Sequence, residues 1–155
     1  MGDERLAVVA GAGGFIGGHL VADLLRRGVA VRAVDVKAVH EWYQVLPGAE
    51  NLELDLRDVE ACHKAVDSAG HVYNLAADMG GMGFIENNRA LCMLSVLINT
   101  HLLMAARDAG AGRFFFSSSA CVYAGSKQAS PEVQGLNESD AYPAMPEDGY
   151  GWEKL

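Results

Sequence analysis

Short apolar runs alternate with longer helical patterns along this chain, and this alternation restricts the fold more than any other feature. Runs typical of β-strands occupy residues 6–10, 29–35, 51–56, 71–77 and 113–119. Helical spacing of apolar residues covers 15–27, 58–67 with Asp58 as a cap, and 86–109. Strands joined by crossover helices lie parallel, with helices on both faces of the sheet. We therefore predict an α/β fold built on a doubly wound parallel sheet.

The last part of the sequence has a different character. Residues 124–147 are polar and contain three of the four prolines, which predicts a loop over the surface. DGYGWEKL, at 148–155, has the pattern of the first turns of another helix, and the sequence stops there. A parallel sheet at this stage normally continues, so we expect residues 1–155 to form one incomplete domain.

Composition disfavours several classes of protein. Half of the 155 residues are hydrophobic, as in a globular domain, and the net charge of −8 disfavours nucleic acid and anionic membranes as partners. No apolar run approaches the roughly 20 residues of a membrane span. The acidic start, MGDERLAVV, does not resemble a signal peptide, so we expect a cytoplasmic protein. Cys62, Cys92 and Cys121 lie far apart, so neither a disulfide framework nor a metal site is expected.

The motif GAGGFIG lies between the first predicted strand and the first predicted helix. In a dinucleotide-binding loop, Gly11 allows the tight turn, Gly14 lets a pyrophosphate approach, and Gly17 lets the helix pack on the strand. Helix amides at Phe15 and Ile16 would then face the phosphates. A glycine triplet alone is also compatible with an ordinary turn.

Two aspartates strengthen the nucleotide-binding interpretation. Asp35 ends the second strand about 20 residues after the glycines, where an acid accepts hydrogen bonds from the adenosine ribose. A carboxylate there repels a 2′-phosphate and favours NAD over NADP, although Arg32 and Lys37 weaken this preference. Asp55 ends the third strand and could reach the adenine amino group, or it could simply form a turn. The prediction is an NAD-binding domain of the Rossmann type.

A tyrosine and a lysine are spaced for one face of the last helix. Tyr150 and Lys154 are four residues apart in YGWEK. An ammonium near a phenol hydroxyl stabilises the phenolate and lowers the tyrosine pKa from about 10, which would provide a base near neutral pH. The same spacing also occurs in plain surface pairs on helices.

The segment SSSACVY places a serine and a cysteine two residues apart where the last apolar run ends. On a strand, Ser119 and Cys121 would point to the same side and face one space. Alternatively, Cys121 is a small apolar residue that fills the floor of a pocket. Cys62 and Cys92 lie in helical patterns and are expected in the core.

Together, these motifs resemble the extended short-chain dehydrogenase/reductase family. The resemblance covers the whole chain through GAGGFIG, Asp35, the DL at 55–56, the NLAA at 74–77, SSSACVY and YGWEK. It implies NAD as the cofactor, and it adds Leu56, Leu75, Ala76 and Ala77 to the residues that hold NAD.

Two stretches narrow the resemblance. Residues 75–88 and 118–123 look most like the nucleotide-sugar epimerases that act at C3 and C5 of GDP-mannose. The glycine-rich run 78–84 could also be only a flexible loop. In such epimerases, the Gly80 and Ala120 positions contact the nucleotide sugar.

The resemblance also implies roles for the catalytic residues. The Tyr150 position takes the proton of the sugar C4 hydroxyl while NAD takes the C4 hydride. The Ser119 position hydrogen-bonds the reacting oxygen, and Lys154 also holds the nicotinamide ribose. The ketone at C4 acidifies the protons at C3 and C5, and Cys121 is implied as the base that removes one. A thiol suits this task when its pKa falls toward neutrality. NADH then returns the hydride.

Some features depart from the family's pattern. Ser95 stands where the family usually has an asparagine, so the local hydrogen-bond network is expected to differ. The lysine that serves as the acid partner of the cysteine, and the substrate domain, would lie beyond residue 155. Two alternatives remain: another NAD-dependent nucleotide-sugar 4-epimerase or 4,6-dehydratase, and a truncated, non-catalytic NAD-binding module. Relatives commonly dimerise through helices of this domain, so the resemblance also implies a homodimer.

Overall fold

The computed structural model describes residues 6–77, 83, 87–130, 132 and 135–155. The chain divides into two compact units. The sheet unit comprises Met1–Ala77 and Leu97–Phe116, and the C-terminal unit comprises Asp78–Val96 and Ser117–Leu155. The glycine motif and the two aspartates fall in the sheet unit, whereas the predicted serine, cysteine, tyrosine and lysine fall in the C-terminal unit.

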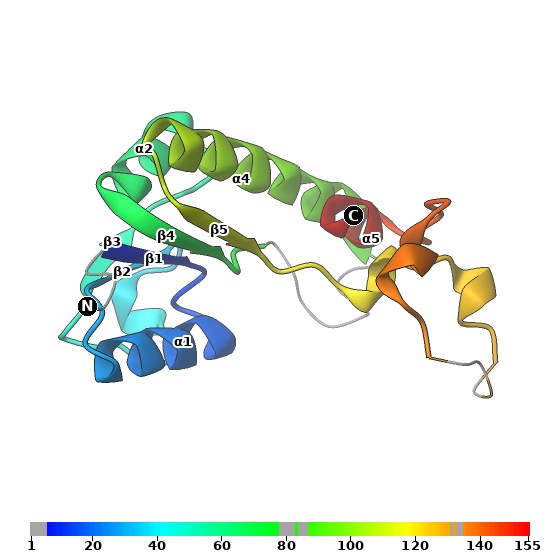
Figure 1. Ribbon diagram of the computed structural model, residues 1–155, viewed down its shortest axis with the longest axis horizontal. Helices are drawn as coiled ribbons and strands as arrows, with labels where there is room; N and C mark the ends of the chain where they lie inside the picture. Colours follow the sequence, from blue (N-terminus) through cyan, green and yellow to red (C-terminus); the bar gives the residue numbers. More distant parts are fainter. Residues whose placement is uncertain (1–5, 78–82, 84–86, 131, 133–134) are drawn as a thin grey trace. The chain divides into compact units, whose positions relative to one another are not determined.

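A five-stranded parallel sheet forms the centre of the sheet unit (Figure 1). Its strands are β1 (Leu6–Ala10), β2 (Val31–Asp35), β3 (Glu50–Glu53), β4 (Ala69–Asn74) and β5 (Arg113–Phe116). They lie in the order β3-β2-β1-β4-β5, so the chain runs outward from β1 in one direction and then returns to continue on its other side. This order is that of a doubly wound sheet, and the predicted fold class is confirmed.

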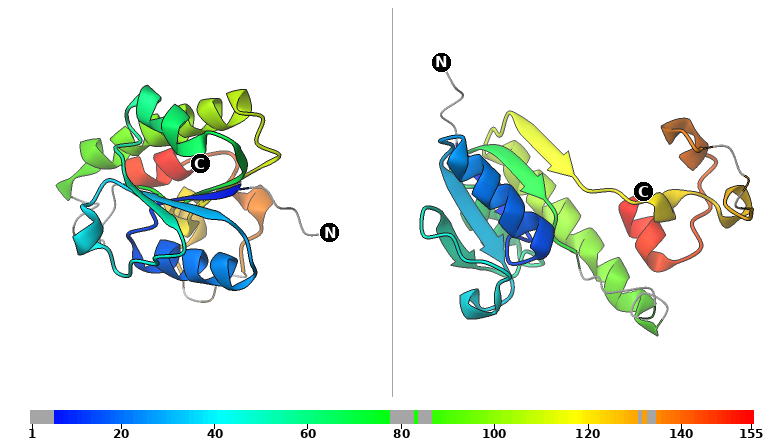
Figure 2. Two further views of the ribbon diagram at one scale, coloured as in Figure 1. Left: turned by 90° about the vertical axis from the view of Figure 1, so that its left-hand side faces the viewer. Right: turned by 90° about the horizontal axis from the view of Figure 1, so that it is seen from below.

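Helices cover both faces of the sheet (Figure 2). They are α1 (Phe15–Arg26), α2 (Val59–Val66) and α4 (Arg89–Asp108), of which Leu97–Asp108 belongs to the sheet unit. Alternate side chains of β1 supply two cores: Val9 packs in the cluster that includes α1, and Val8 packs in the cluster that includes α2 and α4. The strands are buried on both sides because both faces are covered.

Three strands end earlier than the apolar runs that predicted them. The runs 51–56, 71–77 and 113–119 pair only as far as Glu53, Asn74 and Phe116. The residues after each strand are still apolar because a side chain can be buried without its backbone pairing with a neighbouring strand. Leu56, for example, packs in the core three residues after β3 ends.

Helix α4 corrects one expectation from the sequence. Its residues Ala90–Asp108 are long and apolar enough to cross a membrane, with a mean hydropathy of 1.5, whereas the sequence reading found no such run. One helix that passes this test is weak evidence for a membrane span, because core helices of soluble proteins pass it too. Ile98, Leu102, Ala105 and Ala106 of this helix belong to the core of the sheet unit.

The C-terminal unit contains short helical elements. They are the first part of α4, the 3₁₀ turns η2 (Ala120–Val122), η3 (Gly125–Lys127) and η4 (Glu138–Ala141), and the helix α5 (Gly149–Lys154). The predicted loop at 124–147 therefore contains two 3₁₀ turns among its described residues. Asp148 caps α5 by accepting a hydrogen bond from the amide of Gly151 at 2.8 Å, and the predicted start of this helix is confirmed.

Candidate functional site

The glycine loop follows β1 and leads into α1 at the carboxyl edge of the sheet. Gly11 has φ +81°, and a Cβ there would lie 2.9 Å from the backbone of Leu75 and Ala76. A Cβ on Gly17 would collide with the carbonyl oxygen of Gly11. Both positions therefore require glycine, for the turn and for the packing of α1, as the sequence predicts. The loop leaves the amides of the first turn of α1 at the end of the sheet where strand order reverses, which suits a pyrophosphate.

Asp35 is fixed beside this loop. It is 8% exposed at the end of β2, and its carboxylate accepts hydrogen bonds from the amides of Gly13 at 2.9 Å and Lys37 at 3.0 Å. The indole of Trp42 donates to the carbonyl of Lys37 at 2.9 Å and packs against Gly13. The acceptor predicted for the ribose is thus held in a defined orientation by the glycine loop and by the segment after β2.

Arg32 has a structural role that the sequence reading did not foresee. Its guanidinium binds Glu50 at 2.7 Å and the carbonyls of Ala65 and Asp67 at 3.0 and 2.8 Å. An arginine committed to these three partners is not available to a 2′-phosphate. Arg32 therefore no longer counts against the predicted preference for NAD over NADP, and of the two basic residues only Lys37 does.

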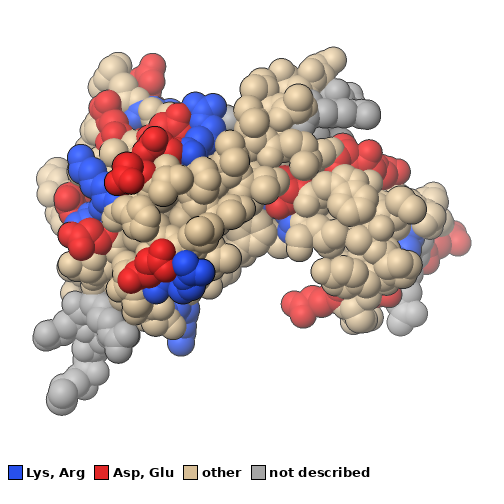
Figure 3. Space-filling model, turned by 90° about the horizontal axis from the view of Figure 1, so that it is seen from above, with Lys and Arg blue, Asp and Glu red and all other residues tan. Residues whose placement is uncertain are grey.

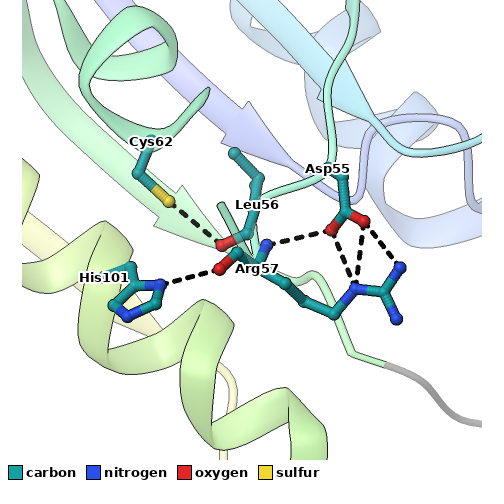
Figure 4. Close-up of polar contacts among 5 residues, drawn as sticks. All are labelled: Asp55, Leu56, Arg57, Cys62 and His101. Carbon is teal, nitrogen blue, oxygen red and sulfur yellow. Dashed lines mark hydrogen bonds and ion pairs between the residues drawn. The ribbon is translucent and has the colours of Figure 1, made fainter. Parts of the chain in front are cut away.

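Asp55 forms an ion pair with Arg57 (Figure 4). The guanidinium of Arg57 contacts both carboxylate oxygens, at 2.6 to 3.0 Å, and its amide donates to Oδ1 at 3.0 Å. The side-chain hydrogen bond from Arg57 is the main cause that holds the pKa of Asp55 below its ordinary value. The predicted adenine ligand is therefore an ionised carboxylate whose direction is set by an arginine that sequence reasoning missed.

The residues next to Asp55 are held from the opposite side (Figure 4). The thiol of Cys62 donates to the carbonyl of Leu56 at 3.1 Å, and Nδ1 of His101 lies 2.9 Å from the carbonyl oxygen of Arg57. Burial, together with the charges of Asp58 and Asp55, raises the pKa of Cys62 to about 12. Cys62 is thus an unreactive core thiol that supports the segment after β3, in agreement with its predicted place in the core.

The segment Leu75–Ala77 follows β4 and approaches the glycine loop. The amide of Leu75 donates to the carbonyl of Ala10 at 3.0 Å, and the amide of Ala76 donates to the side chain of Asn74 at 3.2 Å. Asn74 is buried and donates in turn to Asn99 at 2.8 Å. The carboxyl ends of β1, β2 and β4 therefore bring together all of the predicted cofactor-binding positions except Asp55 and Leu56, which follow β3, and Tyr150 and Lys154, which lie in the C-terminal unit.

In the C-terminal unit, the predicted geometry of Ser119 and Cys121 is wrong. Strand β5 ends at Phe116, so the alternation of a strand does not apply to these residues. Ser119 instead caps η2, and its hydroxyl accepts a hydrogen bond from the amide of Cys121 at 3.2 Å. This local bond between the Ser119 side chain and the backbone competes with continued strand pairing.

Packing of η2 on α5 nevertheless brings the predicted catalytic residues together. Cys121 packs against Tyr150 and Cys92 in one apolar cluster. A side-chain hydrogen bond joins Tyr150 to Ser119. The hydroxyl of Ser118 donates to the carbonyl of Lys154 at 2.8 Å, which fixes the end of α5. Ala120 lies in η2 between the serine and the cysteine, and Gly80 lies outside the described residues.

Tyr150 is 5% exposed, and its pKa is raised above the ordinary value. Burial is the main cause; the hydrogen bond with Ser119 opposes it, and negative charge on Cys121, Glu153 or Cys92 adds to it. The sequence predicted the opposite direction from the nearby ammonium of Lys154. That ammonium lies 5.7 Å from the ring centroid of Tyr150 and is paired with Glu153 at 3.2 Å, so its charge is largely offset.

Two neighbours of Tyr150 were not singled out as site residues from the sequence. Glu153 stands directly before the lysine in YGWEK, and a charged residue three positions after a candidate base was the available signal. Cys92 was correctly expected in the core, but nothing in the sequence indicated that it packs against Tyr150. Ser95 is buried in the same part of α4. Within the described ranges, no three His, Cys, Asp or Glu side chains are grouped as a metal site would require.

The sequence of this chain is similar to the sequences of known enzymes. Residues 7–155 match the NAD dependent epimerase/dehydratase family. The chain is 45% identical to GDP-mannose 3,5-epimerase 1 of Oryza sativa subsp. indica and 44% identical to GDP-mannose 3,5-epimerase of Arabidopsis thaliana, each over 98% of this chain. It covers 40% and 41% of those proteins, so it spans about two fifths of their length.

A solved structure agrees with these sequence matches. Thermus thermophilus UDP-glucose 4-epimerase, determined in complex with NAD, superposes with a TM-score of 0.78 at 29% identity. The alignment covers 96% of this chain and 47% of that one. The similarity thus extends over both the sheet unit and the C-terminal unit.

Proposed function

Because this chain belongs to the NAD dependent epimerase/dehydratase family, we propose that it is the cofactor-binding part of an enzyme that epimerises a nucleotide sugar, with GDP-mannose as the substrate. The observation that carries the proposal is the packing of Cys121 against Tyr150 in the C-terminal unit. A thiol beside the tyrosine base is the feature that epimerisation at C3 and C5 needs and that epimerisation at C4 does not. The identity of 45% to a GDP-mannose 3,5-epimerase supports the choice of sugar nucleotide.

The residues of the sheet unit fit NAD. A Cβ at Gly11 would fill the space between the loop and the backbone of Leu75 and Ala76, and the ionised Asp55 and the oriented Asp35 supply acceptors for adenine and ribose. The first turn of α1 would hold the pyrophosphate. When bound, NAD supplies reversible hydride transfer with the sugar C4.

The C-terminal unit would supply the proton chemistry. Tyr150 would remove the proton of the C4 hydroxyl, and Ser119, which already bonds to Tyr150, would hold the same oxygen. Once C4 is a carbonyl, loss of a proton from C3 or C5 gives an enolate, which makes these protons acidic. Cys121 would take such a proton on one face of the ring, and return of a proton on the opposite face inverts the carbon.

A 4-epimerase or 4,6-dehydratase of another nucleotide sugar is the second candidate. The structural likeness to UDP-glucose 4-epimerase favours it, because that enzyme shares the fold over both units. Tyr150 and Lys154 would serve either reaction, so the tyrosine and lysine do not discriminate. Cys121 does, because inversion at C4 alone needs no additional base at carbon.

Replacement of Cys121 by alanine in the intact protein tests the proposal. We expect Cys121→Ala to abolish incorporation of deuterium at C3 and C5 of GDP-mannose in D₂O, while transient NADH absorbance persists, because hydride transfer does not use the thiol. Tyr150→Phe should lose both signals. Ser126→Ala, at an exposed position of η3 in the same unit, is the matched control and should retain both.

The outcomes separate the candidates. Exchange that survives unchanged in Cys121→Ala would refute the role of the thiol. Turnover of UDP-glucose without exchange at C3 or C5 would favour the 4-epimerase. Binding of NAD with no product from either sugar would favour a non-catalytic module.

We also propose that the protein is a homodimer in which α4 contributes to the interface. The exposed side of this helix carries large apolar residues in its sheet-unit part, among them Leu97, Leu103 and Met104. Figure 3 shows a broad uncharged surface on the side of the molecule where α4 lies. A second copy of the chain would cover this apolar surface.

A further inference from the structure

Glu153 is a buried carboxylate inside the proposed catalytic group. It belongs to α5, and its side chain is fully buried, as is nearly all of the side chain of Lys154. Its Oε1 lies 3.2 Å from Nζ of Lys154, so the two charges form an ion pair away from water. A charge this deeply buried is tolerated only with a counter-charge, and each partner therefore holds the other in place.

Stability alone does not account for this pair. Replacement of a buried ion pair by apolar side chains of similar volume is often neutral or stabilising, so such pairs add little to the free energy of folding. Because this ion pair lies beside the predicted base, Tyr150, we attribute to it an effect on the ionisation of that tyrosine. The ammonium of Lys154 lies 5.7 Å from the ring centroid of Tyr150, and Glu153 holds this ammonium.

The groups that face Tyr150 come from three elements. Ser119 caps η2 and Cys121 lies in it, Cys92 belongs to α4, and Glu153 and Lys154 belong to the same helix as Tyr150. The carboxylate of Glu153 opposes loss of the Tyr150 proton, whereas the ammonium of Lys154 favours it. Burial has the largest effect on the pKa of Tyr150, and the placement of these two charges modifies that effect.

We propose that Glu153 is a positioning residue of the Tyr150–Lys154 pair, whose carboxylate anchors the ammonium of Lys154 beside the ring of Tyr150. This inference rests on the proposed function only for the meaning of Tyr150 as the base. The anchoring itself is a property of the C-terminal unit. Glu153 therefore influences how readily Tyr150 ionises and how Lys154 is presented to NAD.

Titration of Tyr150 in the intact protein tests the inference without any sugar. The tyrosinate absorbance of each protein is measured against pH, and the curve of its Tyr150→Phe counterpart is subtracted so that only Tyr150 remains. Glu153→Gln keeps the size of the side chain and removes its charge. We expect the midpoint of Tyr150 to fall by about one pH unit and the affinity for NAD, measured by calorimetry, to weaken several-fold.

Two further variants make the result decisive. Glu153→Asp keeps the charge but withdraws it from Lys154, so it should give a smaller shift and a smaller loss of NAD affinity. Glu138→Gln removes an exposed carboxylate of η4 in the same unit and should behave as the parent protein. Glu153→Asp replaces Glu153→Gln as the test if Glu153→Gln fails to fold, as judged by circular dichroism. In that case, a lowered Tyr150 midpoint and a weakened NAD affinity in Glu153→Asp support the inference, and unchanged values overturn it.

The inference is also overturned if Glu153→Gln folds and leaves both the Tyr150 midpoint and the NAD affinity unchanged, or if Glu138→Gln shifts them equally. Failure of the proposed function has a different signature. It appears as absence of product from GDP-mannose in the parent protein, whatever the titration of Tyr150 shows.

Discussion

At the scale of single residues, Tyr150 shows how burial can outweigh a neighbouring cation. The spacing of Tyr150 and Lys154 suggests a tyrosine with a lowered pKa, yet the pKa is raised because the hydroxyl is buried and the ammonium is paired with Glu153. The sequence shows that a lysine lies on the same helix face, but it does not show which anion the lysine binds. Only the packed structure gives the net charge around the hydroxyl.

The raised pKa of Tyr150 predicts how stability depends on pH. A folded pKa above the unfolded value means that its contribution to stability is fully present below about pH 10 and is lost as pH rises through the folded pKa. The free energy of unfolding should therefore fall as pH rises above about 10. We expect Tyr150→Phe to reduce this fall, and denaturant unfolding at several alkaline pH values measures it.

Tyr142→Phe is the control for this prediction, because Tyr142 is exposed in the same unit and its replacement should leave the alkaline slope unchanged. An equal slope for the parent protein and for Tyr150→Phe would contradict the assignment of a raised pKa to Tyr150.

At the scale of elements, the sequence predicted which segments form helices and strands better than it predicted where strands end. The first strand matches its apolar run residue for residue, and α1 ends within one residue of its predicted end. Strand β5 stops at Phe116, before the serines, and the following turn η2 sets the positions of Ser119 and Cys121. Such a turn depends on local side-chain bonds and on α5, which periodicity does not reveal.

The contact between η2 and α5 depends on a glycine. A Cβ on Gly151 would collide with the carbonyl oxygen of Cys121 and lie 2.7 Å from Cβ of Pro146. We expect Gly151→Ala to destabilise the protein by about 1–3 kcal/mol, as overpacking does, and to separate Cys121 from Tyr150. Urea unfolding measures the first effect, and deuterium exchange at C3 and C5 of GDP-mannose measures the second.

Gly135→Ala is the matched substitution, because a Cβ at Gly135 would meet no atom within 4 Å. It should change neither stability nor exchange by more than a few tenths of a kcal/mol or a small factor. If Gly151→Ala behaves in the same way, the contact between η2 and α5 does not hold the catalytic group together.

At the scale of the whole molecule, the fold class followed from the sequence because strand–helix alternation leaves few topologies. The positions of Gly11, Gly17 and Asp35 at the edge of the sheet followed for the same reason. The partners of charged side chains did not follow. Arg32 binds groups that the fold brings together, whereas Arg57 and Glu153 pair with near neighbours in the sequence whose side-chain directions only the structure shows. Each of the three changes the meaning of a predicted site residue.

The outer side of α4 carries a prediction for the assembly. Leu103 is 51% exposed on this helix, and an apolar side chain in that position would be covered in the proposed homodimer. Leu103→Glu should place a charge in the interface and convert the dimer into a monomer, as measured by sedimentation equilibrium, while NAD affinity stays close to that of the parent protein.

Val59→Glu is the control for this prediction, because it introduces the same charge at an exposed apolar position of α2 and should leave the dimer intact. Burial of an unpaired carboxylate would cost more free energy than the apolar contact at this position contributes, so Leu103→Glu is incompatible with an intact interface on α4. A monomeric parent protein, or a Leu103→Glu variant that remains dimeric, would therefore contradict the assignment of α4 to the interface.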